Sequence, residues 1–258
     1  MSSSTALIPT GFGINCEAET AQAFRLAGAS PQQVHLNDLI EQPAHLARCG
    51  ILALAGGFSF GDHLGAGKVF ANRLRKLEGP LARFVADGGL VIGICNGFQT
   101  MVRLGLVPDG AVTTQSVGLA ANRHGCFYDG WVTLGVDPAS PCVFTRGIER
   151  LAVPVRHGEG RLRAPDAVRE RIRRAHLAPV RYLDPDTGTT AEGFPANPNG
   201  SDDAIAGLCD PSGRIFGLMP HPEAFLYPEC RPGWRRGGAR PDGDGLQIFR
   251  NAVEACAR

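Results

Sequence analysis

The strongest constraint on the fold is an apolar run, Leu90-Val-Ile-Gly-Ile94, that passes directly into Cys95-Asn-Gly97. Runs that are apolar at every position are typical of parallel strands buried on both faces. The residues that follow, 98–104, carry apolar side chains at helical spacing and stop at Gly105. The sequence therefore predicts that Cys95 occupies a sharp turn between a buried strand and a helix.

The rest of the chain repeats this alternation of short apolar runs and helical patterns, which indicates an α/β fold with a mostly parallel sheet covered by helices. Strands are expected at 6–9, 34–36, 51–55, 131–136, 151–155, 207–209 and 215–218, the last two as a hairpin around 210–213. Helical patterns lie at 17–27, 69–77, 81–86 and 246–257. No repeat or linker interrupts residues 1–258, so one domain is expected, with a Pro/Gly/Arg-rich loop at 227–245.

Composition excludes several classes of protein. The net charge of +1 provides no overall field that would attract nucleic acid or an anionic membrane. No apolar stretch reaches the ~18 residues of a membrane span, and the first residues lack the pattern of a signal peptide. None of the eight cysteines forms a C-x-x-C pair, so neither a zinc ribbon nor a redox dithiol is predicted. A cytoplasmic protein with reduced thiols is expected.

The position of Cys95 suits a nucleophile. Small flanking residues allow the strained turn that exposes a nucleophilic side chain, and the following helix N-terminus favours thiolate over thiol. The N–H of Asn96 is then placed to donate to an oxyanion formed beside the sulfur. A buried structural cysteine is an equally common reading of such a turn taken alone.

Two competing motifs lie upstream. Gly57-Phe-Ser59-Phe-Gly61 matches the serine nucleophile pattern G-x-S-x-G, but residues 62–67 are poor helix formers where that motif requires a helix. This glycine-rich loop is better suited to cradle an oxyanion with its N–H groups. A phosphate-binding loop ending at Lys68 is not predicted, because Asp62 and Val69 replace its required residues.

A base for Cys95 is suggested by Met219-Pro-His-Pro-Glu223. Residues two apart in extended chain share a side, so His221 and Glu223 are placed to present an imidazole and its orienting carboxylate. A surface turn is the alternative, and the zinc-deaminase pattern is excluded because no P-C-x-x-C follows. His157-Gly-Glu-Gly160 suggests a second constrained loop. Seven arginines in 161–181 indicate a solvated helix face, or a surface for an acidic partner or a phosphorylated ligand.

Together these segments resemble the class I, triad-type glutamine amidotransferases. The resemblance rests on Gly11-Phe-Gly-Ile-Asn-Cys16, Gly56-Gly-Phe-Ser-Phe-Gly-Asp62, Gly93-Ile-Cys-Asn-Gly-Phe-Gln99, His157-Gly-Glu-Gly160, Asn197-Pro-Asn-Gly-Ser201 with Ile205-Ala-Gly207, and Gly217-Leu-Met-Pro-His-Pro-Glu223. These segments span nearly the whole chain in the expected order. The resemblance implies a flavodoxin-like three-layer α/β/α fold.

The resemblance also implies the roles of individual residues. Cys95, His221 and Glu223 would form the catalytic triad, and Gly57 and Asn96 would supply the oxyanion hole. Gln99, His157 and Gly158 would line or adjoin the glutamine pocket. No metal site is implied, and no cofactor is expected on this chain.

The implied activity is glutamine hydrolysis, with ammonia passed to a synthetase subunit that converts formylglycinamide ribonucleotide to its amidine in purine biosynthesis. ATP and magnesium would bind that synthetase, and a small bridging subunit would complete the assembly. Gly130 stands where the resemblance implies Arg, within the atypical segment 122–131; the triad does not depend on this segment, but a partner contact there would. The alternatives are an amidotransferase that serves another synthetase, a cysteine hydrolase or peptidase of the same fold, and an inactive binding subunit.

Overall fold

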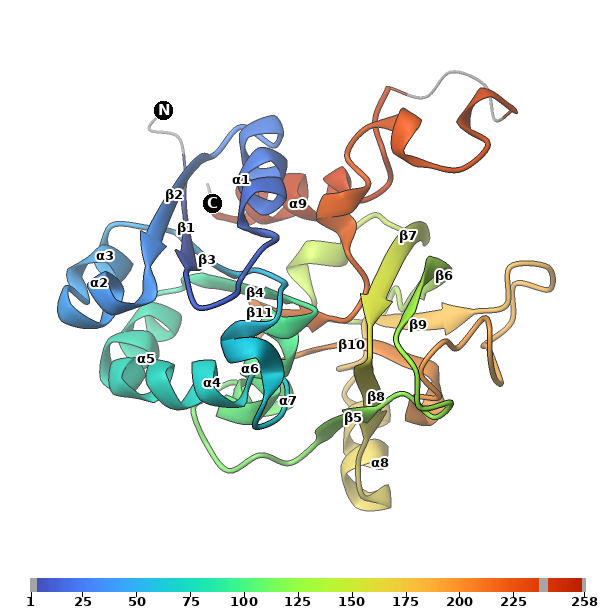
Figure 1. The fold of residues 1–258 in the computed structure, drawn as a ribbon, viewed down its shortest axis with the longest axis horizontal. Coiled ribbons are helices and arrows are strands. Elements are labelled where there is room, and N and C mark those ends of the chain that lie inside the picture. Colours follow the sequence, from blue (N-terminus) through green and yellow to red (C-terminus); the bar gives the residue numbers. More distant parts are fainter. Residues whose placement is uncertain (1–3, 237–240, 257–258) are drawn as a thin grey trace.

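A computed structural model describes residues 4–236 and 241–256 of the chain (Figure 1). Within these residues one large mixed sheet runs through the molecule and a two-stranded sheet lies beside it. The strands of the large sheet, in spatial order, are β2 (Ser30–His35), β1 (Thr5–Thr10), β3 (Ile51–Leu54), β4 (Leu90–Ile94), β11 (Ile215–Leu218), β10 (Ile205–Cys209), β9 (Val180–Leu183), β6 (Tyr128–Val136) and β7 (Arg150–His157). The smaller sheet pairs β5 (Gly118–Ala121) with β8 (Glu159–Arg163).

The first half of the large sheet, from β2 to β11, is parallel. Every residue of β3, β4 and β11 is buried, which agrees with their uninterrupted apolar sequences. The helices lie in two layers: α1 and α9 on one side of these strands, and α4, α5 and α6 on the other (Figure 1). The predicted three-layer α/β class is confirmed.

The helices of the described residues connect or cover these strands. They are α1 (Glu17–Leu26), α2 (Leu36–Glu41), α3 (Ala44–Ala47), α4 (Lys68–Leu74), α5 (Glu78–Ala86), α6 (Asn96–Leu104), α7 (Leu106–Asp109), α8 (Asp166–Arg174) and α9 (Leu246–Cys256). Helix α6 is buried on nearly all sides, because it packs against β3, β4, β11 and α4.

The second half of the sheet, from β11 to β7, is antiparallel. The predicted hairpin is present: β10 and β11 pair around a turn in which the Asp210 carboxylate accepts from the N–H groups of Ser212 and Ile215. The predicted strands at 131–136 and 151–155 lie inside β6 and β7, which pair along their whole length. The loop predicted at 157–160 is instead the end of β7, a bend at Gly158 and the start of β8, and it lies beside Gln99 of the parallel half.

Some boundaries differ from the prediction. The second strand ends at His35 and Leu36 begins α2, because the His35 side chain accepts from the N–H of Asn37 and caps that helix. The loop at 227–245 has short 3-10 turns at 228–230 and 234–236, and its residues 237–240 lie outside the described residues, as does the predicted helix end at residue 257. One domain over 1–258 stays a prediction, and the continuity of the large sheet supports it.

Candidate active site

The candidate site forms where four parallel strands end. β1, β3, β4 and β11 are neighbours in the sheet, so the segments after their carboxyl ends meet at one edge. The pairing of Leu54 with Gly93 and of Leu218 with Ile94 places Cys95 beside the start of the segment that carries His221. The fold therefore brings together motifs that are far apart in the sequence.

Cys95 lies in a strained turn between β4 and α6, as predicted. Its backbone angles, φ 51° and ψ −106°, are unusual for a residue with a side chain and are typical of strain held at a functional site. Tight packing enforces the turn. A Cβ added at Gly97 would lie 1.9 Å from the Leu54 carbonyl oxygen, and one at Gly93 would lie 2.3 Å from the Met101 sulfur.

The Cys95 side chain is nearly enclosed, at 6% exposure. Its Sγ lies 3.7 Å from the carbonyl oxygen of Arg156 on β7, and its backbone N–H donates to Leu218. The sulfur therefore faces the junction between the parallel and antiparallel halves of the sheet, close to the amino terminus of α6.

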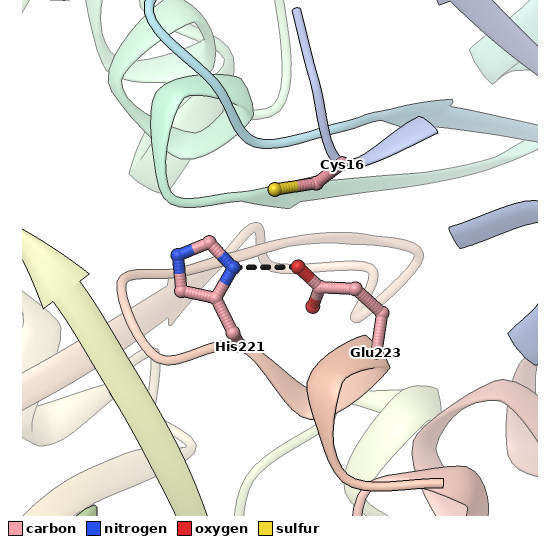
Figure 2. A group of neighbouring side chains, drawn as sticks. All are labelled: Cys16, His221 and Glu223. Carbon is pink, nitrogen blue, oxygen red and sulfur yellow. Dashed lines mark hydrogen bonds and ion pairs between the residues drawn. The ribbon is translucent and has the colours of Figure 1, made fainter. Parts of the chain in front are cut away.

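His221 and Glu223 form a buried pair beside it. The Nδ1 of His221 lies 2.5 Å from Oε1 of Glu223, and both side chains are almost wholly buried (Figure 2). The backbone N–H of His221 donates to the carbonyl of Pro154 on β7. Its other ring nitrogen, Nε2, is buried and has no hydrogen-bond partner in the described residues. Glu223 thus holds the Nδ1 of His221 and leaves its Nε2 available for proton transfer.

The electrostatics of this pair favour a charged imidazole. Burial by itself lowers the pKa of His221, but the negative charges of Glu223 and Cys95 oppose it, and we assign a pKa raised well above the ordinary histidine value. A raised histidine pKa beside a cysteine favours the imidazolium–thiolate pair over the neutral pair. The arrangement is suited to nucleophilic catalysis by sulfur.

The loop after β3 lies beside the base, because a Cβ added at Gly56 would lie 3.0 Å from the His221 ring. Gly57 pairs with Ile14 in an isolated antiparallel bridge, in which Asn15 donates to Gly56 and Phe58 donates to Gly13. In a pair of this kind the N–H groups of the two facing residues point away from each other. The Gly57 N–H is therefore directed away from the 11–16 loop. The Asn96 N–H belongs to the first turn of α6, whose N–H groups have no partner within the helix. Both predicted oxyanion donors lie at the same edge of the sheet.

We expect Gly57→Ala to lower glutamine turnover about 100-fold, the usual cost of losing one oxyanion donor. The φ of Gly57 is 148°, and an added Cβ would lie 2.7 Å from both the Gly13 carbonyl oxygen and the Ile14 Cα, so the loop must move. The measurement is kcat for glutamate formation. Gly79→Ala is the matched control, because nothing lies within 4 Å of its added Cβ. Equal activity in the two variants would remove Gly57 from the oxyanion hole.

The residues predicted near the glutamine pocket are each held by hydrogen bonds to other residues. Gln99 is buried, donates to the Glu159 carbonyl at 2.6 Å and accepts from the Asn96 side chain at 3.1 Å. The ring of His157 lies between the side chains of Asn122 and Asn199, at 3.1 and 3.5 Å. The Gly158 carbonyl accepts from Asn122. We propose that Gln99 and His157 support the wall of the glutamine pocket by fixing the residues that line it.

The buried His157 makes acid stability testable. Burial, with the nearby charge of His221, lowers the pKa of His157 to about 3. Below pH ~6.5 the His157 imidazole binds a proton in the unfolded chain but stays neutral in the folded chain. The free energy of unfolding therefore falls by up to ~1.4 kcal/mol per pH unit as the pH drops towards 3. The free energy of unfolding is measured in urea at pH 7, 6 and 5. We expect its slope with pH in His157→Gln to correspond to about one proton fewer taken up on unfolding than in wild type. His63→Gln, at an exposed position, is the control; an unchanged slope in His157→Gln would contradict the assignment.

Comparison with known proteins follows this geometry. The family model of the CobB/CobQ-like glutamine amidotransferase domain matches residues 3–256. The chain belongs to this glutamine amidotransferase family. It is 46% identical over 255 residues to the phosphoribosylformylglycinamidine synthase subunit PurQ of Dehalococcoides mccartyi, covering 98% of each chain. It is 42% identical to the protein of the same name from Methanococcus maripaludis, covering 96% of each.

A solved structure supports the same assignment. A chain in the structure of PurLQS from Thermotoga maritima superposes with a TM-score of 0.73 at 30% identity, covering 98% of each chain. The resemblance inferred from the sequence motifs is therefore confirmed for the family and for its fold.

The atypical segment of this amidotransferase has a local explanation. At Gly130, where the sequence resemblance led us to expect arginine, an added Cβ would lie 2.6 Å from the Tyr128 hydroxyl oxygen. The ring of Tyr128 thus occupies the space that a larger residue at 130 would need. Asn122, at the start of the segment, is buried and donates to the carbonyls of Cys126 and His157. The segment is therefore tied to the junction of β7 and β8 at His157 and Gly158.

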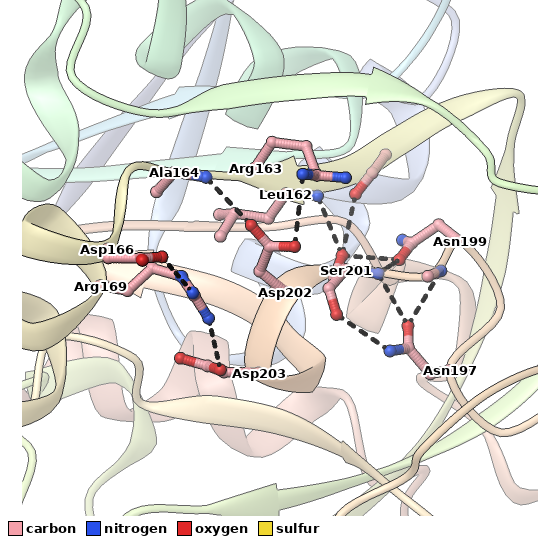
Figure 3. Close-up of polar contacts among 12 residues, drawn as sticks. Leu162, Arg163, Ala164, Asp166, Arg169, Asn197, Asn199, Ser201, Asp202 and Asp203 are labelled. Carbon is pink, nitrogen blue, oxygen red and sulfur yellow. Dashed lines mark hydrogen bonds and ion pairs between the residues drawn. The ribbon is translucent and has the colours of Figure 1, made fainter.

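The arginine-rich segment is mostly paired within the chain, and Figure 3 shows Arg163 and Arg169 beside their aspartate partners. In α8, Arg169 contacts Asp166 and Asp203, at 2.5 and 3.0 Å, and Arg173 contacts Glu170 and Asp203. Arg163 and Arg171 pair with Asp202 and Asp109. The neighbouring segment 197–203 is held to β8 by the Ser201 hydroxyl, which accepts from Leu162. Of the two readings, a solvated, internally neutralised face is favoured.

One buried residue beside the base was not predicted as part of the site. Cys16, at the end of the 11–16 loop, lies next to His221 and Glu223 (Figure 2). A Cβ added at Gly56 would lie 3.0 Å from the His221 ring and 3.3 Å from the Cys16 sulfur, so these groups converge. The segment 11–16 was part of the family resemblance, but spacing along the chain carries no signal for this contact.

Proposed function

We propose that this chain is the glutaminase subunit of a phosphoribosylformylglycinamidine synthase. It hydrolyses glutamine and supplies ammonia for the ATP-dependent conversion of formylglycinamide ribonucleotide to its amidine in purine biosynthesis. The observation that carries this proposal is the buried Cys95, His221 and Glu223 constellation in a chain that matches PurQ relatives over nearly their whole length. Their shared name describes a subunit, which supports a role inside an assembly.

The proposed chemistry begins at sulfur. The Cys95 thiolate attacks the side-chain amide carbon of glutamine, and the N–H groups of Gly57 and Asn96 receive the developing oxyanion. The imidazolium of His221 gives its Nε2 proton to the departing nitrogen, which leaves as ammonia. A γ-glutamyl thioester remains on Cys95.

The second half of the reaction reverses these roles. His221, now neutral, accepts a proton from water, which attacks the thioester carbon and releases glutamate. Glu223 holds Nδ1 throughout and keeps Nε2 directed at the reacting atoms. The strained turn at Cys95 keeps the sulfur fixed between the two oxyanion donors and the imidazole.

We propose the following division of labour between subunits. This chain binds glutamine and needs no cofactor or metal for its own chemistry, and it acts on neither nucleic acid nor membrane. ATP, magnesium and the nucleotide acceptor belong to the synthetase subunit, and a small bridging subunit joins the two. No helix in the described ranges is long and apolar enough to cross a membrane. We propose that the assembly is cytoplasmic.

The decisive experiment reconstitutes this chain with its synthetase and bridging subunits and measures amidine formation from glutamine, ATP and formylglycinamide ribonucleotide. The proposal predicts one glutamate formed for each amidine. Glutamine hydrolysis without transfer to this acceptor would indicate an amidotransferase for another synthetase. Hydrolysis of peptides in place of glutamine would indicate a cysteine peptidase, and turnover of neither would indicate an inactive binding subunit.

A further inference from the structure

The chemistry proposed for Cys95 leaves a second thiol beside the base unused. Cys16 is 8% exposed and follows the loop that supports Gly57. Its Sγ, a ring nitrogen of His221 and a carboxylate oxygen of Glu223 all lie within 4.8 Å of one another. Figure 2 shows the sulfur above the gap between the His221 Nδ1 and the Glu223 carboxylate. Three side chains from two separate segments thus converge on one small space.

The donor set is that of a zinc ligand sphere. Thiolate sulfur, imidazole nitrogen and carboxylate oxygen are the three protein donors that Zn²⁺ takes, at ~2.3 Å for sulfur and ~2.0–2.2 Å for the others. Tetrahedral ligation at those lengths separates donors by roughly 3.3–3.6 Å. All three donors already lie within 4.8 Å of one another, and the Nδ1–Oε1 pair, now 2.5 Å apart, must open by about 1 Å. A thiolate and a carboxylate also neutralise a divalent cation, which burial demands.

Two further observations point to a ligand here. The Oε2 of Glu223 is buried and has no hydrogen-bond partner within the described ranges. Unpartnered buried polar atoms carry a desolvation cost that a bound ion removes. The Cys16 sulfur lies close to solvent, because it is 3.4 Å from the Oδ1 of Asn15, which is exposed. A hydrated cation therefore has a short route to the donors.

We propose that Cys16, His221 and Glu223 form an inhibitory site for a thiophilic divalent cation such as Zn²⁺, with water as the fourth ligand. This cation is a regulator or inhibitor and has no part in the reaction; its effect on turnover rests on the function proposed above. Binding displaces the Cys16 proton and the proton on the His221 Nδ1.

The site explains how the cation blocks catalysis. With a metal ion on Nδ1, the remaining proton of His221 must reside on Nε2. Donating that proton to the departing nitrogen would leave an imidazolate instead of a neutral imidazole, so the ring is a weaker acid and the release of ammonia from the adduct on Cys95 is slowed. Glu223 is drawn to the metal and no longer orients the ring. Inhibition is therefore expected even though the cation does not touch the Cys95 sulfur.

The test is a zinc titration of glutaminase activity in the reconstituted complex, run with wild type, Cys16→Ser and Cys16→Ala, each normalised to its own uninhibited rate. We expect zinc to inhibit wild type reversibly, with activity restored by a chelator. Both Cys16 variants should need roughly 10-fold or more zinc for half-inhibition. Cys126→Ser is the matched control, because Cys126 is an exposed thiol outside the cluster and should leave the titration unchanged.

A second readout is independent of turnover. Co²⁺ added to the same proteins should give a thiolate-to-metal absorption band in wild type and Cys126→Ser that is missing in Cys16→Ser. Equal inhibition of wild type and both Cys16 variants, or a cobalt–thiolate band that survives Cys16→Ser, would overturn the proposal. If the complex shows no glutaminase activity but the band still depends on Cys16, the proposed function fails and the metal site stands.

Discussion

Replacing Cys95 with alanine is expected to abolish glutamine hydrolysis, with kcat falling at least ~10⁴-fold. The proposed thioester cannot form without the sulfur, and the oxyanion donors and the base have no attached intermediate to stabilise. The backbone turn should persist, because Gly93 and Gly97 pack tightly whichever side chain lies between them. The measurement is glutamate formation by the reconstituted complex under saturating glutamine.

The control for this variant separates lost chemistry from lost assembly. Free ammonia supplied in place of glutamine should still support amidine formation by a Cys95→Ala complex at the wild-type rate, because the synthetase is intact. Cys126→Ala changes an exposed thiol and should retain full glutamine-dependent activity. Glutamine hydrolysis that survives in Cys95→Ala would refute the mechanism, and a loss of ammonia-dependent activity would show that the substitution damages the complex.

The local turn at Cys95 was predictable because its determinants are consecutive in the sequence. An all-apolar strand, two glycines and a helical pattern specify a strand-to-helix turn without reference to the rest of the chain. The same holds for the parallel strands and for the β10–β11 hairpin, whose turn is encoded around Asp210. Antiparallel strand β9 and the placement of α8 depend on long-range pairing, and local patterns did not predict them.

The side-chain environment was less predictable than the backbone. His157 belongs to a motif that resembles a pocket loop, yet Asn122 and Asn199 enclose its ring from positions 35 and 42 residues away. The arginines of α8 read as a charged face, and their partner Asp203 lies in another loop. Cys16 lies beside His221 although about two hundred residues separate them in the sequence, because their segments meet at the same edge of the sheet. Contacts of this kind depend on the topology of the fold, so they cannot be predicted from residue spacing along the chain.

Glu223→Gln is the second substitution with a large expected effect, a fall in kcat of about 10³- to 10⁴-fold by analogy with the orienting carboxylate of serine proteases. The glutamine amide preserves the size of the side chain but removes the charge 2.5 Å from His221 Nδ1. Glu223 raises the pKa of His221 against the opposing effect of burial. Without that charge the imidazolium is less stable, and its ring is free to adopt the other tautomer.

The direction in which the pH profile of kcat shifts distinguishes a role of Glu223 in keeping His221 protonated from a purely structural role. His221 must be protonated to release ammonia, so activity falls as pH rises through its pKa. Because Glu223→Gln lowers that pKa, the alkaline limb of the kcat profile should move to lower pH, and Glu223→Asp should restore part of both the rate and the limb. Urea unfolding of the same variants reports any loss of fold separately. A reduced rate with an unmoved alkaline limb would mean that Glu223 supports the turn but does not set the charge of the base.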